Sequence, residues 1–137
     1  MLDSQELLKD KDWEAALGAP QKAADALIAA SDTELPSDYL AFLAYSNGGQ
    51  GSLSVHPLWL VLYPAKLVTD LLNDATRRLT FHSVLTIGSN GAGESIAFDF
   101  RPGAAFGIVY FDSANTDLQE SVVPLAASFT QLLTKLA

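Results

Sequence analysis

The chain has 137 residues, of which 49% are hydrophobic and 18% are charged; this size and composition fit one folded domain and exclude a disordered protein. It contains no cysteine, which excludes disulfides, zinc–thiolate sites and cysteine nucleophiles. The net charge of −8 argues against a direct nucleic-acid partner, because binding a phosphate backbone requires clustered lysine and arginine.

The first part of the chain is predicted to be helical. A capping box at residues 3–6 opens a helix that extends to about Leu17, where Gly18 and Pro20 end it. A second helix begins near Pro20 and covers residues 23–30. We expect residues 1–34 to form a helical part of the same domain.

A third helix has clear signals at both ends. Pro36 suits the first turn, and Asn47-Gly48 supply residues that favour the left-handed conformation at a helix end. The apolar residues within it recur at helical spacing, which places one face of the helix in the core. These residues are Leu35, Tyr39, Phe42 and Leu43.

The rest of the chain is predicted to alternate strands with two helices. Short strands are expected at residues 52–55 and 58–62, followed by a helix from Pro64 to Leu79. Strands at residues 84–87, 94–100 and 105–111 follow, and a terminal helix covers residues 124–136. Short connections favour antiparallel neighbours. The predicted fold is α+β, one domain over residues 1–137, with a mostly antiparallel, possibly mixed, sheet packed against helices.

Three features in order resemble the SUKH superfamily, which includes fungal Smi/Knr-like cell-wall regulators and many bacterial immunity proteins. They are the helix from Leu35-Pro36 through Tyr39 to Asn47-Gly48, the glycine-rich turn at residues 88–93 before a strand that carries Asp99, and a terminal helix with Ser128-Phe129. The resemblance extends from about Leu35 to Leu136. It implies an α+β fold, no enzymatic activity, and binding of partner proteins, commonly a nuclease toxin.

An acidic surface is the first candidate for partner binding. Between His82 and Glu120 there are five acidic residues and one basic residue, and an acidic patch speeds association with a basic protein. The candidates are Glu94, Asp99, Asp112, Asp117 and Glu120. Aspartate is disfavoured within a strand, so Asp99 has either a binding role or a structural one in an ion pair with Arg101.

Two further residues are candidates on other grounds. Trp59 lies in an apolar run that favours a core position, although tryptophan is also common at interface hot spots. Asn47, with the loop to Gly51, is the alternative location for an interface.

Other kinds of site have little support. The glycines at residues 88–93 precede a strand rather than a helix, which favours a hairpin over a phosphate cradle. His56 and His82 lack spaced ligand partners, so we expect no metal and no cofactor. A triad of Ser83, His82 and Asp112 lacks any nucleophile elbow, which argues against a small hydrolase.

The sequence therefore predicts a cytoplasmic, non-catalytic protein-binding domain. No signal peptide and no apolar run of about 20 residues is present. An immunity-type protein that binds a basic toxin domain is the first hypothesis, and a regulatory or scaffold module in a larger assembly is the alternative.

Overall fold

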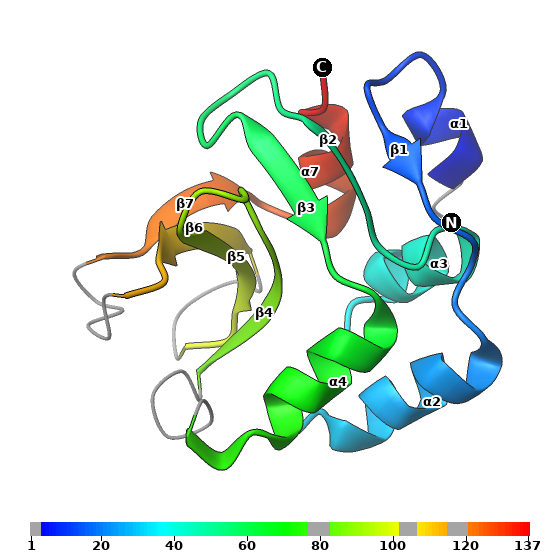
Figure 1. Ribbon diagram of the computed structural model, residues 1–137, viewed down its shortest axis with the longest axis vertical. Helices are drawn as coiled ribbons and strands as arrows, with labels where there is room; N and C mark the ends of the chain where they lie inside the picture. Colours follow the sequence, from blue (N-terminus) through cyan, green and yellow to red (C-terminus); the bar gives the residue numbers. More distant parts are fainter. Residues whose placement is uncertain (1–3, 77–82, 102–106, 115–120) are drawn as a thin grey trace.

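Seven antiparallel strands form one sheet in the computed structural model, which describes residues 4–76, 83–101, 107–114 and 121–137 (Figure 1). The strands are β1 (Glu14–Ala15), β2 (Gly49–Ser52), β3 (Trp59–Leu62), β4 (Val84–Ser89), β5 (Glu94–Asp99), β6 (Ile108–Asp112) and β7 (Val123–Ala126). They neighbour one another in chain order, and every pair is antiparallel. The predicted α+β class is confirmed, and the described strands contain no parallel pair.

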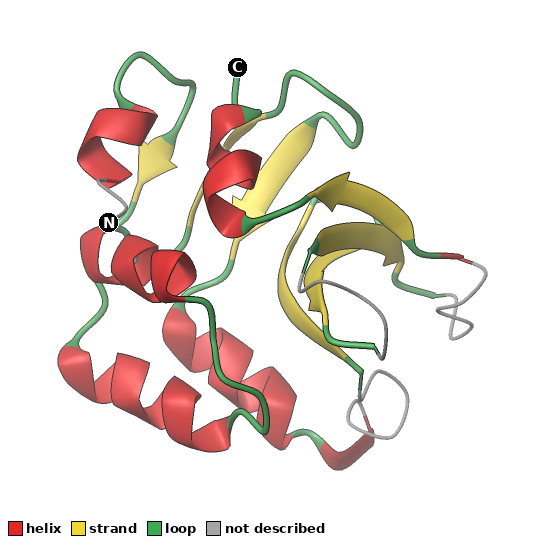
Figure 2. Ribbon diagram, turned by 180° about the vertical axis from the view of Figure 1, so that it is seen from behind, coloured by secondary structure: helices red, strands yellow, loops and turns green. Residues whose placement is uncertain are grey.

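Helices cover the sheet mainly from one side. They are α1 (Ser4–Leu8), α2 (Gln21–Ala30), α3 (Ser37–Tyr45), α4 (Ala65–Asn73) and α7 (Phe129–Thr134). Figures 1 and 2 show α7 lying across β2 and β3, with α2 and α4 side by side at the other end of the molecule. The second and third predicted helices are present near their predicted positions. The helix after Pro64 begins as predicted but ends at Asn73, where Asp74 adopts an extended conformation, instead of continuing toward Leu79.

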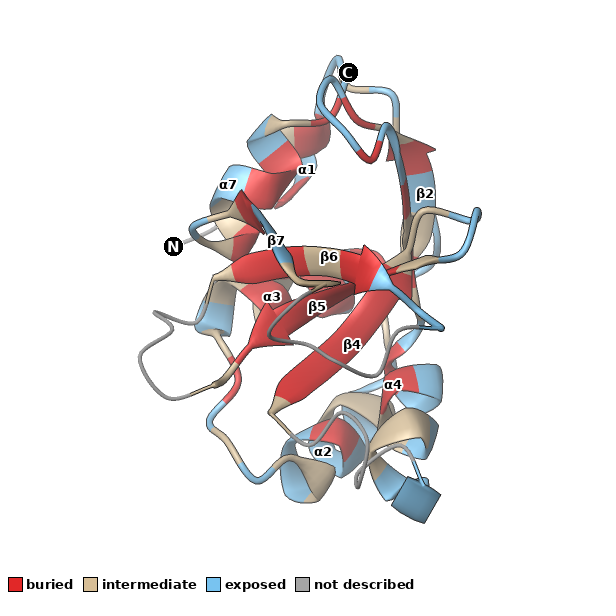
Figure 3. Ribbon diagram, turned by 90° about the vertical axis from the view of Figure 1, so that its left-hand side faces the viewer, coloured by how far each residue is buried: buried red, intermediate tan, exposed pale blue. Residues whose placement is uncertain are grey.

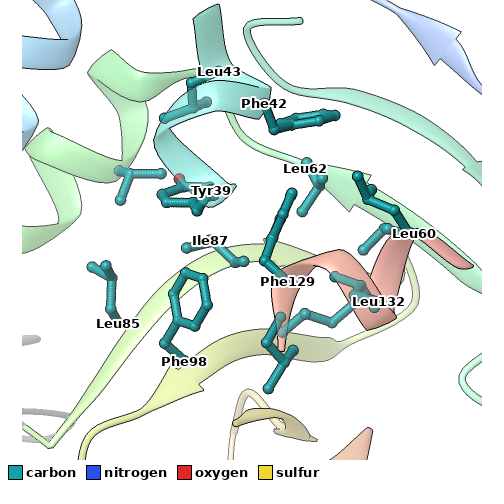
Figure 4. Close-up of a cluster of buried hydrophobic side chains, with 14 of the residues drawn as sticks. Tyr39, Phe42, Leu43, Leu60, Leu62, Leu85, Ile87, Phe98, Phe129 and Leu132 are labelled. Atoms are coloured by element: carbon teal, nitrogen blue, oxygen red, sulfur yellow. The ribbon is translucent and has the colours of Figure 1, made fainter. Parts of the chain in front are cut away.

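One apolar cluster joins these helices to the sheet (Figure 4). Its centre is aromatic: the ring of Phe129 lies 5.1 Å from that of Phe42 and 5.2 Å from that of Tyr39, between ring centroids. The ring of Phe98 lies 5.3 Å from that of Tyr39. Because α3, β5 and α7 all contribute rings to this centre, packing there fixes both helices on the sheet.

The central strands are buried on both faces (Figure 3). Successive side chains of a strand alternate between faces, so Ile96 and Phe98 enter the main cluster, whereas Ala97 belongs to a smaller cluster on the other face. Val84, Val109 and Phe111 complete that smaller cluster. The sheet therefore offers little free face, and exposed candidates for binding gather at strand ends and in loops.

The prediction of one helix extending to Leu17 is wrong. The helix α1 ends at Leu8, Asp10 adopts a left-handed φ of 65°, and β1 follows. The carboxylate of Asp12 accepts hydrogen bonds from the N–H and hydroxyl groups of Ser52, and the ring of Trp13 packs edge-on against that of Phe42. Contacts with β2 and α3 thus override the local helical pattern.

The strand β2 lies earlier than predicted because its glycines are required for close approach. A Cβ atom on Gly51 would collide with the carbonyl oxygen of Asp12, and one on Gly49 would collide with the Trp13 ring. Glycine is depleted in strands, so residue preferences alone place the strand elsewhere.

The predicted helix over residues 124–136 is shorter than expected. Residues Val123–Ala126 form the edge strand β7, where Pro124 is tolerated because an edge strand leaves one side unpaired. The helix α7 begins after Ser128, whose hydroxyl accepts a hydrogen bond from the Gln131 N–H at 3.1 Å. Leu125 is buried, but it reaches the core as a residue of β7 and not of the predicted helix.

Candidate partner-binding site

Two acidic residues lie directly opposite each other at one end of the sheet. Glu94 begins β5 and pairs in register with Asp112, which ends β6. Opposed residues of an antiparallel pair project from the same face, with Cβ atoms about 5 Å apart. Tyr110 lies on that face, two residues before Asp112. Strand register thus brings together two carboxylates and a phenol ring.

A histidine from the β2–β3 loop completes this group. The Nε2 atom of His56 lies 3.5 Å from Oε1 of Glu94, and its ring centroid lies 5.3 Å from that of Tyr110. Asn90 also donates a hydrogen bond of 3.0 Å to the same Glu94 oxygen. Glu94 is therefore held in place by two side chains, whereas Asp112 is exposed and accepts a hydrogen bond from the Ala114 N–H.

Exposed apolar side chains lie close to His56 along the chain. Val55, Leu58 and Trp59 come from the β2–β3 loop and the start of β3, and all three are exposed. The Trp59 indole borders the β4–β5 turn, where a Cβ atom on Gly91 would lie 3.8 Å from the indole Cδ1. We call this set the loop patch; its members are Val55, His56, Leu58, Trp59, Glu94, Tyr110 and Asp112.

The glycine-rich turn is a hairpin, as the sequence predicts, between β4 and β5. Its N–H groups bond to side chains of the turn itself: Asn90 Oδ1 accepts from Ala92 and Glu94, and the Ser89 hydroxyl accepts from Gly91. Because these N–H groups are already paired, they are not available to surround an anion as in a phosphate cradle.

Asp99 lies away from the loop patch. It ends β5, on the opposite face from Glu94, and only 5% of its surface is exposed. Arg101 pairs with both carboxylate oxygens, at 2.9 Å and 2.8 Å. Burial acts to raise the pKa of Asp99, but the hydrogen bonds and charge of Arg101 outweigh burial and hold the pKa below its ordinary value. The ion pair considered from the sequence is present.

Asn47 is also tied into the fold. Its Oδ1 atom accepts a hydrogen bond of 2.8 Å from the N–H of Ala65, the first residue of α4, and its own N–H bonds to the Leu17 carbonyl. Asn47 thus joins the end of α3 to the start of α4 and to the segment after β1.

The remaining candidates are separated or lie outside the description. Asp117, Glu120 and His82 fall outside the described residues. Ser83 directly precedes β4, whose Val84 pairs with Asp99, so Ser83 and Asp112 lie at opposite ends of β5. Among the described residues, no three histidine or acidic side chains gather as metal ligands. No described helix has the length and apolar character needed to cross a membrane.

Comparison with known protein families identifies the family of this chain. Residues 18–135 match the SMI1 / KNR4 family (SUKH-1). The chain belongs to this family. The comparison with individual curated proteins found no match. The SUKH-1 match begins at residue 18, before the Leu35 start of the resemblance, and it includes α2 as well as every strand from β2 to β7.

Four members of the loop patch are absent from the binding candidates drawn from the sequence. His56 is considered there only as a metal ligand, and Val55, Leu58 and Tyr110 are not singled out. The alternation of Tyr110 with Asp112 along β6 was a usable signal, since it places both on one face. The position of the β2–β3 loop over that face depends on the SUKH-1 fold itself and leaves no local sequence signal.

Proposed function

We propose that this SUKH-1 protein is a non-catalytic binding domain of the immunity type, which neutralises a basic toxin domain by binding it through the loop patch. Membership of the SMI1/KNR4 family supports a role in protein binding. The observation that most supports this surface is the pair of opposed carboxylates, Glu94 and Asp112, in contact through His56 with the loop that leads to the exposed Leu58 and Trp59.

The charge arrangement favours a cationic partner group. Like charges directly opposite each other in a sheet are destabilising, and the side chains of His56 and Asn90 contact the same oxygen of Glu94, Oε1. A lysine or arginine brought by the partner would lie between two carboxylates and reduce their repulsion. The net charge of −8 adds long-range attraction for a basic protein, which raises association rates about tenfold or more at low salt.

The exposed apolar side chains of the loop patch supply binding free energy that charge pairs alone do not. Exposed charge pairs contribute about 0–1 kcal/mol each, whereas burial of apolar surface contributes about 25 cal/mol per Å². Leu58 and Trp59 therefore provide area to be buried, and the acidic pair selects the partner and orients it.

The test separates local charge from total charge. In the patch variant Glu94 and Asp112 become lysine, and in the control variant the exposed helix residues Asp25 and Asp70 become lysine; each changes the net charge by about +4. Circular dichroism checks that both variants fold. A protein captured from the native cell with the wild-type chain is purified, and its association is followed at low and high salt.

We expect the patch variant to associate about tenfold more slowly at low salt, the control variant to change much less, and the difference to shrink at high salt. Equal slowing of both variants would assign the effect to total charge. An unchanged rate for the folded patch variant would move the interface away from the acidic pair; residues 47–51, the alternative drawn from the sequence, are largely taken up by β2, which pairs with β1 and β3. Rescue of growth on co-expression with the captured protein would support neutralisation, and its absence would favour a regulatory module.

A further inference from the structure

Leu58 has a backbone conformation that leucine rarely adopts. Its φ is 73°, in the left-handed region, where a side chain with a Cβ atom crowds the backbone and glycine or asparagine is favoured. Its side chain is also 60% exposed. A strained and exposed leucine contributes little to the core, so its conformation and its exposure require another explanation.

The surrounding contacts impose this conformation on Leu58. Its carbonyl accepts a hydrogen bond of 2.8 Å from the Leu53 N–H, and its own N–H donates to the Val55 carbonyl at 2.8 Å. The loop is in turn attached to the C-terminal segment, because Ser54 donates hydrogen bonds to the Lys135 carbonyl from both its N–H and its hydroxyl. The loop is thus held at both ends, and the Leu58 side chain projects from a fixed base.

We infer that Leu58 is the apolar anchor of the loop patch and enters an apolar pocket of a protein partner whose rim carries lysine or arginine. This inference rests on the proposed function and names the contact at its centre. The partner's chemistry follows from the groups of this segment and its contacts: Val55 and Trp59 are further exposed apolar side chains, and His56, two residues before Leu58, lies 3.5 Å from the carboxylate of Glu94, which faces Asp112. A held loop also loses little conformational entropy on binding, which favours such an anchor.

A structural role for Leu58 and a role in partner binding make opposite predictions about stability. If the side chain holds the fold together, its removal lowers the unfolding midpoint. If it serves a partner, Leu58→Asn and Leu58→Gly relieve the backbone strain, and the unfolding midpoint in urea stays the same or rises. Leu17→Asn is the matched control, because Leu17 is 90% exposed and follows β1, outside the loop patch.

The experiment measures stability and affinity on the same four proteins: the wild type, Leu58→Asn, Leu58→Gly and Leu17→Asn. The probe is the purified protein that the wild-type chain captures, titrated by calorimetry. We expect both Leu58 variants to keep or raise the unfolding midpoint and to bind at least tenfold more weakly, while Leu17→Asn binds like the wild type.

Several results would overturn the inference and leave the proposed function standing. Wild-type affinity in both Leu58 variants, together with weak binding by the lysine variant of Glu94 and Asp112, leaves an acidic interface without this anchor. A lowered midpoint in both Leu58 variants makes the leucine structural. A dimer of the free protein that dissociates on Leu58→Asn assigns the residue to self-association. If the wild-type chain binds no protein, the inference and the proposed function fail together.

Discussion

Replacement of Phe129 by alanine tests the aromatic centre that fixes α7 on the sheet. Phe129 is 1% exposed, and its ring centroid lies 5.1 Å, 5.2 Å and 6.3 Å from those of Phe42, Tyr39 and Phe98. Loss of a buried phenylalanine costs about 3–5 kcal/mol, since lost burial and the remaining cavity add. The three ring contacts, each worth about 0.5–1.5 kcal/mol beyond burial, place the expected cost near 4 kcal/mol.

Urea unfolding followed by circular dichroism measures this cost. For a chain of this length, about 4 kcal/mol corresponds to a fall in melting temperature of about 12–16 °C. Leu67→Ala is the control, because Leu67 lies exposed on α4 and its truncation should cost less than about 1 kcal/mol. A loss below about 1 kcal/mol for Phe129→Ala would refute the packing of α7 described above.

Three further substitutions test individual contacts. Tyr39→Phe removes a hydroxyl for which no described group offers a hydrogen bond, and whose burial raises the pKa of Tyr39. Urea unfolding should show a free energy of unfolding higher by up to about 1 kcal/mol, whereas a lower one would indicate a bound water. Asn47→Ala removes the acceptor of the Ala65 N–H and should cost about 1 kcal/mol with partner affinity unchanged; weaker binding by the folded variant would return Asn47 to the interface. Asp99→Asn should make the loss of stability on acidification smaller. In the wild type, a carboxyl group whose pKa is lowered by folding stabilises the fold above its ordinary pKa of 3.8, and this stabilisation is lost as the pH falls through the lowered pKa. Identical acid-unfolding curves for wild type and Asp99→Asn would contradict a strong pair with Arg101.

Elements with long apolar patterns could be predicted from the sequence. The helix α3 has its proline start and its apolar face in the local sequence, and β5 has a strict alternation at Ile96 and Phe98. In both cases local preference and burial favour the same structure, so the three-dimensional fold only fixes what the pattern already indicates.

Short elements whose partners are distant in the chain could not be predicted. The segment after Leu8 is shaped by contacts of Asp12 with Ser52 and of Trp13 with Gly49, which lie far along the chain. The strand β7 depends on pairing with β6, and the pairing of Val109 with Pro124 has no signal within residues 123–126. Tertiary contacts override local preference in such segments.

The candidate site was predicted in part. The sequence names Glu94 and Asp112, but their direct opposition follows from the β5–β6 register, which a list of acidic residues lacks. The sequence leaves two roles open for Asp99, and the bidentate pair with Arg101 at its buried position favours the structural one. A list of acidic residues therefore puts Glu94 and Asp99 together, although the fold places them on opposite faces of β5.

Two locally unfavourable features occur together in the loop patch, and their combination favours this surface for binding. Leu58 is strained and exposed, and Glu94 faces Asp112 as a like charge. Nearby residues of the same types are satisfied: Asp99, on the same strand as Glu94, is paired with Arg101, and Leu60, two residues after Leu58, is fully buried. Natural folds retain local conflicts mainly where function requires them. Substitutions in the loop patch should therefore weaken binding without loss of stability, whereas substitutions at Asp99 should do the reverse.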